Sequence, residues 1–196
     1  SDDLDDPQRI VRKDNPLPCT LGRICDHLCE QACVRTHLDQ PVAIRDIKRF
    51  IVDGERQPES RADIEFSGQK AAIIGAGPGG MSAAIELARG GFDVEVFEKH
   101  GYAGGMVGGV VPEYRLPKSV FDKDYAALTE LGVRVHYNTH VGRDLTLSQL
   151  RENGFSHTVI TVGAQLGKAL PLDGADSDDV VDALDFLRRS KDRNVP

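Results

Sequence analysis

A glycine-rich run between an apolar strand and an amphipathic helix constrains this chain more than any other feature. Residues Gly75-Ala76-Gly77-Pro78-Gly79-Gly80 fit the pattern G-x-G-x-x-G. The run follows the short apolar segment 71–74 directly, and it precedes an apolar helical face made by Met81, Ala84, Ile85 and Ala88. That context is the one that a dinucleotide-binding loop requires. The sequence therefore predicts a strand, a phosphate-binding loop and a helix, rather than a glycine turn without a ligand.

Each residue of the run has its own expected role. Gly75 permits a tight turn, Gly77 lets a pyrophosphate approach the backbone, and Gly80 lets the helix pack closely on the strand. The helix that begins at Pro78 and Gly79 presents free N–H groups and the positive end of its dipole to phosphates. We expect all five residues to bind the cofactor.

An acidic residue and a second glycine run follow. Glu98 ends the second expected strand, at residues 92–98, where an acid accepts hydrogen bonds from a nucleotide ribose. The glycine pairs within residues 104–109 favour a backbone that lies flat against a bulky ligand over a loop that is merely flexible. Neither glycine run contains cysteine, so a dithiol beside a flavin is excluded. These motifs leave FAD and NAD both open, because both cofactors use this unit.

The rest of the chain alternates between helix and strand patterns. The expected elements are helices at 117–131 and about 180–189, a helix from Thr146, and strands at 133–137 and 158–162. Thr146 and Gln149 have capping-box spacing, and Asn153-Gly154 is a good helix stop. Alternation of this kind implies a parallel sheet, so the fold class is α/β, with a Rossmann-like domain over residues 70–196.

The first 53 residues have a helical pattern and contain all four cysteines. The expected helices start at Asp6-Pro7, run from Cys25 to Arg35, and start again at Asp39-Gln40-Pro41, with Gly54 as a stop. The polar residues 54–69 predict a linker. The chain therefore divides into a helical segment, a linker and the Rossmann-like domain.

Three of the cysteines recur every four residues. On one helix, the sulfurs of Cys25, Cys29 and Cys33 would form a single stripe that could offer thiolates to iron–sulfur clusters. Cys19 would be the fourth ligand of a cluster if the chain acted alone. A zinc site and inert packing as small apolar side chains are the alternatives.

Composition excludes several classes of partner. The formal net charge of −7 and the pI near 5.3 give no general attraction to nucleic acid or to an anionic membrane. No apolar run approaches the ~20 residues of a membrane span. The acidic start of the chain does not resemble a signal peptide. A cytoplasmic protein is expected.

The motifs together resemble a known family. The cysteine segment reads Asn15-Pro16-Leu17-Pro18, then Gly22-Arg23-Ile24-Cys25, then Cys29-Glu30-Gln31-Ala32-Cys33 and Pro41-Val42-Ala43-Ile44-Arg45. It resembles the second cysteine block of glutamate synthase small subunits, of the N-terminal part of dihydropyrimidine dehydrogenase, and of selenate reductase-type proteins. The run Gly104-Gly105-Met106, continued by Pro112-Glu113-Tyr114-Arg115-Leu116-Pro117-Lys118, agrees with it. The resemblance covers residues 14–187.

This resemblance implies an electron-transfer module that connects NADPH, FAD and two 4Fe–4S clusters to a terminal oxidoreductase. No side chain is then expected to act as a catalytic acid or base. The implied FAD-binding residues are those of the glycine loop together with Glu98, Lys99, Gly104, Gly105, Met106, Arg115, Val141 and Gly163. The implied cluster ligands are Cys25, Cys29 and Cys33.

The sequence departs from the family pattern in three places. The family has a cysteine directly before Gly-Arg-Ile-Cys, where this chain has Leu21, and Cys19 lies two residues earlier. An upstream cysteine block and a downstream NADPH-binding domain are also expected and are not in this sequence. We therefore expect this chain to be a part of a larger polypeptide and to hold neither cofactor strongly by itself. A zinc-capped NAD dehydrogenase and a docking scaffold without catalytic function are the alternatives.

Overall fold

The computed structural model describes residues 7–54, 59–168 and 171–191 of the chain. A parallel sheet with the strand order β3-β2-β1-β4 lies at its centre. The strands are β1 (Lys70–Ile74), β2 (Asp93–Phe97), β3 (Arg134–His136) and β4 (Phe155–Ile160). Ile74 pairs with Phe97 on one side and with Ile160 on the other, so these three strands end level. The predicted parallel α/β sheet is confirmed.

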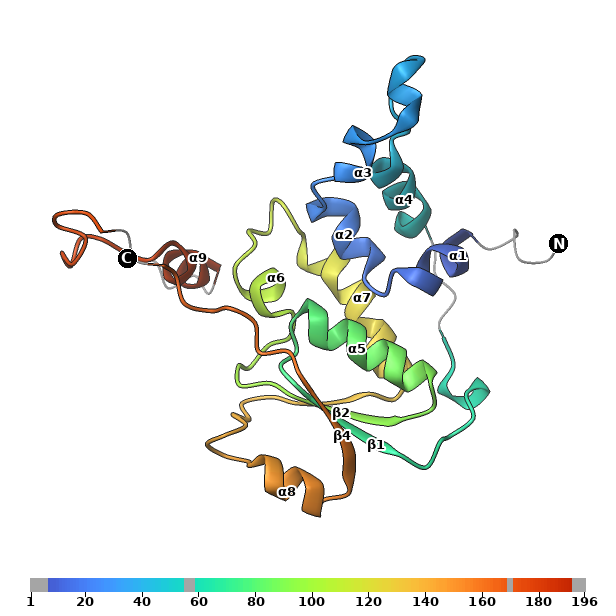
Figure 1. Ribbon diagram of the computed structural model, residues 1–196, viewed down its shortest axis with the longest axis vertical. Coiled ribbons are helices and arrows are strands. Elements are labelled where there is room, and N and C mark those ends of the chain that lie inside the picture. Colours follow the sequence, from blue (N-terminus) through green and yellow to red (C-terminus); the bar gives the residue numbers. More distant parts are fainter. Residues whose placement is uncertain (1–6, 55–58, 169–170, 192–196) are drawn as a thin grey trace.

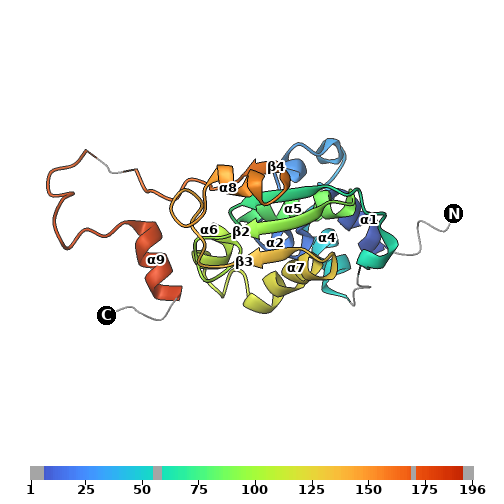
Figure 2. The same ribbon diagram turned by 90° about the horizontal axis from the view of Figure 1, so that it is seen from below.

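Helices cover both faces of this sheet (Figures 1 and 2). One face carries α5 (Pro78–Arg89) and α7 (Lys118–Glu130), and the other carries α8 (Leu147–Glu152). The short α6 (Gly105–Gly109) lies beside α5, and α9 (Ala183–Lys191) stands at the side of the molecule. Thr146 and Gln149 form the predicted capping box of α8.

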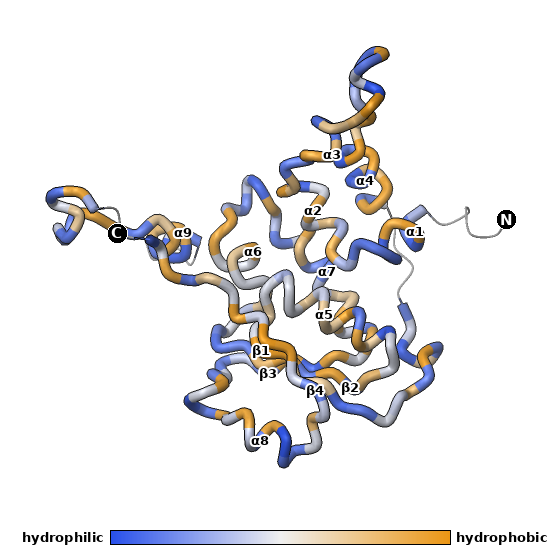
Figure 3. Tube along the Cα trace, viewed as in Figure 1, coloured by the Kyte–Doolittle hydropathy of each residue, from blue (hydrophilic) through white to orange (hydrophobic). Residues whose placement is uncertain are grey.

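The main core fills the layer between the sheet and its two longer helices. Ile73, Val94 and Val96 of the sheet are buried against Met81 and Ile85 of α5. The predicted apolar face of α5 is thus the buried one. Figure 3 shows the apolar residues gathered along the strands. This packing fixes the start of α5, and with it the glycine loop.

The N-terminal segment is a group of short helices that packs on α7 (Figure 1). Its elements are α1 (Pro7–Asp14), α2 (Pro18–Ile24), α3 (Leu28–Gln31), the 3-10 turn η2 (Val34–His37) and α4 (Ile44–Asp53). A further 3-10 turn, η3 (Arg61–Asp63), lies in the predicted linker, of which residues 55–58 are outside the described part. The sequence did not reveal α2 as a separate helix.

The prediction of one helix from Cys25 to Arg35 is wrong. Cys25 has extended backbone angles, with φ −62° and ψ 135°, and His27 is left-handed, with φ 47°. Cys33 is extended again, so only the four residues of α3 are α-helical between them. These three non-helical residues remove the predicted stripe of sulfurs, because helical spacing of side chains requires an unbroken helix.

Three other boundaries also differ from the sequence predictions. The helix expected to start near Pro41 starts at Ile44, and the last helix starts at Ala183 rather than near residue 180. The last strand starts at Phe155, before the predicted 158, because its pairing with β1 begins at Lys70. Polar residues in the first half of β4 hid the strand, since that half is largely exposed.

Candidate functional site

The glycine loop is held against the end of β4. Gly75 has φ 104°, and a Cβ atom there would lie 2.7 Å from the Thr161 carbonyl oxygen. A Cβ atom on Gly80 would overlap the Gly75 carbonyl oxygen and lie 2.8 Å from Thr161 Oγ1. The Thr161 hydroxyl donates to the carbonyls of Ile74 and Gly75, 3.0 Å away in each case. Gly75 therefore makes the turn, and Gly80 lets helix and strand approach closely.

Gly77, by contrast, faces open space. The one heavy atom near a Cβ built on Gly77 is the Gly105 Cα, at 4.0 Å. Gly77 is the N-cap of α5, Pro78 opens the helix, and no side chain caps the first turn. A Cβ on Gly79 would make only an ordinary contact, 3.9 Å from Thr161. The free N–H groups and the helix dipole are therefore available to an anion at this open side.

Glu98 holds the glycine loop in place through hydrogen bonds to the backbone. Its side chain is 4% exposed, and its two oxygens accept the backbone N–H groups of Ala76 and His100, each at 2.8 Å. Each carboxylate oxygen can accept a further hydrogen bond, so a ribose hydroxyl could still bind Glu98. The carboxylate thus joins the glycine loop to the segment that follows β2.

A small pocket of about 130 Å³ lies at the ends of the first three strands. It brings together four of the predicted cofactor residues, Gly75, Glu98, Lys99 and Val141. Lys99 is exposed and Val141 is half-buried. The pocket is also lined by Ile74, Phe97, Thr139, His140, Val162 and Gln165. Sequence analysis assigned no cofactor role to Thr139, His140 or Gln165. The only signal for these three residues is their place in the connections that follow β3 and β4, which many connecting residues share.

The second glycine run packs on the first. The Gly104 N–H donates to the Ala76 carbonyl at 2.7 Å, and a Cβ on Gly105 would lie 3.0 Å from the Gly77 Cα. Gly104 and Gly105 have φ of 97° and 52°, which side chains rarely tolerate. Close packing of the backbone thus explains in part why these positions are glycine. Residues 105–109 form α6, and not the flat loop that the sequence suggested.

The remaining predicted residues, Met106, Arg115 and Gly163, do not line this pocket. Met106 is in α6, where its sulfur accepts a hydrogen bond from Arg188 Nη2 at 3.9 Å. Arg115 is exposed in the connection between α6 and α7. Gly163 has φ 67° and follows Thr161-Val162, and nothing lies within 4 Å of a Cβ built there. The structure therefore brings part of the predicted set together and leaves Arg115 and Gly163 facing open surroundings.

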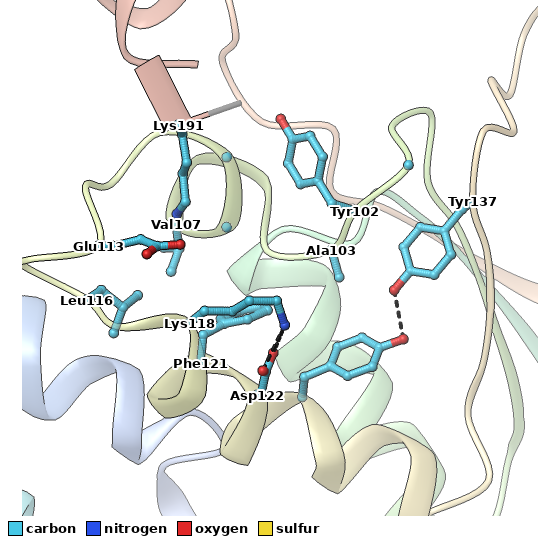
Figure 4. Close-up of a pocket in the computed structure, with 14 residues that line it drawn as sticks. Tyr102, Ala103, Val107, Glu113, Leu116, Lys118, Phe121, Asp122, Tyr137 and Lys191 are labelled. Carbon is cyan, nitrogen blue, oxygen red and sulfur yellow. Dashed lines mark hydrogen bonds and ion pairs between the residues drawn. The ribbon is translucent and has the colours of Figure 1, made fainter. Parts of the chain in front are cut away.

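A larger cavity of about 480 Å³ lies beside α6 and α7 (Figure 4). The Tyr137 hydroxyl donates to the Tyr125 hydroxyl at 2.7 Å, and Lys118 pairs with Asp122 at 2.7 Å. The lining includes Gly108 and Gly109 but no residue of the first glycine run. This cavity is thus separate from the small pocket.

The cysteine segment forms no assembled metal site by itself. Cys25 and Cys33 are half-buried, Cys29 is exposed, and all three are free thiols. Within residues 7–54, 59–168 and 171–191, no three Cys, His, Asp or Glu side chains are close enough to hold one metal ion. Three accessible thiols on short turns fit a cluster that also takes ligands from elsewhere, because thiolates are the usual ligands of iron–sulfur clusters.

Cys19 has a different environment from the other three cysteines. It is 1% exposed, and its sulfur accepts a hydrogen bond from Arg12 Nη2 at 3.3 Å. Burial, together with the nearby charge of Asp124, raises the pKa of the Cys19 thiol to about 11. Because the Cys19 thiol is buried and held by Arg12 and the Val52 carbonyl, it lies apart from the three accessible thiols. Sequence analysis did not predict this contact of Cys19 with Asp124, because in the sequence Asp124 looks like an ordinary helix residue.

Comparison with known proteins agrees with both halves of the chain. Residues 1–60 match the family model described as dihydropyrimidine dehydrogenase domain II, 4Fe–4S cluster. Residues 73–141 match the model of the NAD(P)-binding Rossmann-like domain. No helix in the part of the chain that the structure describes is both long and apolar enough to cross a membrane.

Curated relatives match most of the chain. It is 37% identical over 187 residues to the NAD-dependent dihydropyrimidine dehydrogenase subunit PreT of Escherichia coli K12, covering 92% of this chain and 44% of PreT. It is 37% identical over 191 residues to the NADP(+)-dependent formate dehydrogenase subunit beta of Moorella thermoacetica, covering 85% and 27%. For the NADPH-Fe(3+) oxidoreductase subunit beta of Geobacter sulfurreducens, identity is 32% over 195 residues, covering 95% and 29%.

The chain thus spans less than half the length of these relatives. Their names agree in one respect, since each is a subunit of an oxidoreductase that uses NAD or NADP. The chain thus matches a 4Fe–4S segment of the dihydropyrimidine dehydrogenase type in its first part and an NAD(P)-binding Rossmann-like domain in its second, and over most of its length it is similar to subunits of NAD(P)-dependent oxidoreductases.

Proposed function

We propose that this chain is the part of an NADPH-dependent oxidoreductase that holds FAD and relays electrons between the flavin and 4Fe–4S clusters. One observation carries this proposal. Gly77, at an uncapped helix N-terminus, leaves room for a ligand group, and Gly75 of the same loop lines a pocket that also contains Glu98 and Val141. That arrangement fits the pyrophosphate and the adenosine of a dinucleotide.

The chain's residues would bind and orient the cofactors. The amides of the first turn of α5 would hold the phosphates, and Glu98 would hold the ribose. The exposed Lys99 and Arg115 supply positive charge, and Gly104, Gly105 and Met106 would border the flavin. When bound, FAD supplies hydride chemistry and the clusters supply one-electron transfer. No side chain is assigned a proton-transfer role.

The metal ligands in this proposal are Cys25, Cys29 and Cys33. Cys19 is left out, because its thiol is buried and engaged by Arg12. We infer that further ligands come from an upstream cysteine block, and that a downstream domain binds NADPH. The length of the relatives supports both inferences. We also infer a cytoplasmic location, a terminal oxidoreductase partner, and the domain division 1–53, 54–69 and 70–196.

Cofactor analysis of the full-length polypeptide, purified without oxygen, tests this function. We expect bound flavin and several iron atoms per chain. Gly77→Val should remove flavin and keep iron, whereas Cys29→Ser should lower iron and keep flavin. Zinc in place of iron would contradict the proposal and favour a zinc-capped dehydrogenase. A polypeptide that takes up neither cofactor would favour a docking scaffold.

A further inference from the structure

A buried ion pair joins the helical segment to the Rossmann unit. Asp124 lies in α7 and is 0% exposed, and Arg12 of α1 is 5% exposed. Arg12 Nη1 lies 3.6 Å from Asp124 Oδ1. Charged side chains are seldom buried so completely unless partners compensate them. These two residues come from opposite sides of the contact between the segment and the unit.

Asp124 also caps a helix of the cysteine segment. Its carboxylate oxygens accept the backbone N–H groups of Cys19 and Thr20, at 3.2 and 2.7 Å. These amides lie in the first turn of α2, whose own N-cap residue, Leu17, has no side-chain acceptor for them. A carboxylate satisfies such amides and interacts favourably with the helix dipole. Thus α7 fixes the start of the helix that ends next to Cys25.

Further contacts surround this polar cluster. Arg12 Nη2 donates to Cys19 Sγ, and Arg89 Nη1 of α5 donates to the Arg12 carbonyl at 3.1 Å. Around them, Cys19 and Val52 of the segment share an apolar cluster with Val107 of α6. The contact therefore reaches from the cysteine segment to α6, whose first residue, Gly105, lies close to Gly77 of the glycine loop.

We propose that Asp124, together with Arg12, is a positioning residue that sets the place of the cysteine segment relative to the nucleotide loop. This inference rests on the proposed electron relay, whose two cofactors must be held at a fixed separation. Electron transfer slows steeply as the distance between two cofactors grows, so a displaced cysteine segment would slow the relay. The buried ion pair holds the cysteine segment in one position on the Rossmann unit, which apolar packing alone specifies less tightly.

Hydrogen exchange on the chain itself tests the contact without any cofactor. Asp124→Asn keeps the side-chain size but removes the charge and one acceptor. The amides of Cys19 and Thr20 should exchange about tenfold faster, while those of β1 and α5 keep their rates. Asp122→Asn is the matched control, because Asp122 is exposed on the same helix and paired with Lys118. Unchanged exchange at Cys19 and Thr20, or equal acceleration everywhere, would overturn the proposal.

Rapid-mixing kinetics on the full-length polypeptide test the consequence. After NADPH is added, Asp124→Asn should reduce flavin at the normal rate but pass electrons to iron at least about tenfold more slowly. Its flavin and iron contents should be unchanged, and Asp122→Asn should behave as wild type. A normal transfer rate in Asp124→Asn would overturn the positioning role. If the wild-type polypeptide lacks flavin or iron, the proposed function fails instead, and the exchange rates alone decide the contact.

Discussion

The glycine loop and the cysteine segment differ in how much of their structure the chain itself supplies. Around the loop, Ile73 and Met81 are fully buried, and Thr161 and Glu98 hold the turns in place. In the cysteine segment, Val34 is 79% exposed and Leu38 is 87% exposed. The candidate nucleotide loop is therefore held in place by packing within the chain. Cys29 and Cys33 lie near these exposed side chains, whereas Cys25 directly follows α2, whose Ile24 packs against the cluster around Cys19 and Val52.

The largest expected effect is a loss of stability when the glycine loop is changed. Gly80→Ala would place a Cβ atom on the Gly75 carbonyl, and we expect it to lower the free energy of unfolding by about 3 kcal/mol. Gly79→Ala is the control, because its Cβ would make only an ordinary contact. It should change stability by less than about 0.5 kcal/mol. Urea unfolding measures both, and equal losses would contradict the described close approach.

The next effect concerns Cys19, which is buried where the cysteine segment packs on α7. Its pKa is raised from 9.0 to about 11 in the folded chain, so the folded state holds the proton more tightly than the unfolded state. Stability should therefore fall as pH rises from 9 to 11, by about 2 kcal/mol from this group. Unfolding of wild type and Cys19→Ala at pH 8 and 11 isolates this loss. The same pH dependence in both proteins would show that Cys19 is not the cause.

A smaller effect is expected at the open side of the glycine loop. Gly77→Val should weaken FAD binding by about tenfold or more, which corresponds to about 1.4 kcal/mol, because the side chain would occupy the path of the pyrophosphate. Stability should change by less than about 1 kcal/mol, since a Cβ on Gly77 meets little. A fluorescence titration of FAD gives the affinity. Undiminished binding would remove the pyrophosphate from this position.

The smallest effect is expected in the cysteine segment. Cys29 is exposed, so Cys29→Ser should change the stability of the chain by less than about 0.5 kcal/mol. Chemical denaturation measures this change. A loss of several kcal/mol would show that the segment has a packed core around Cys29 after all.

Sequence patterns predicted the parts of the fold that have strong local signals. The glycine run next to an apolar strand identified the β1 loop, and Thr146 with Gln149 identified the start of α8. The four-residue spacing of the cysteines led to the wrong prediction of one continuous helix. Such spacing places side chains on one face only while the backbone stays helical, and the backbone at His27 is left-handed. Asp124 could not be found at all. Its role depends on α2, which is about a hundred residues away in the sequence and adjacent only in the folded chain.

A titration of the chain with FAD, followed residue by residue through amide chemical shifts, tests most directly whether the nucleotide site is already formed. We predict saturable shifts at Gly77, Gly79 and Glu98, weak in affinity but localised, with the amides of Cys29 and Cys33 unaffected. Shifts of equal size in the cysteine segment, or none at the glycine loop of a folded chain, would contradict the assignment of FAD to this loop.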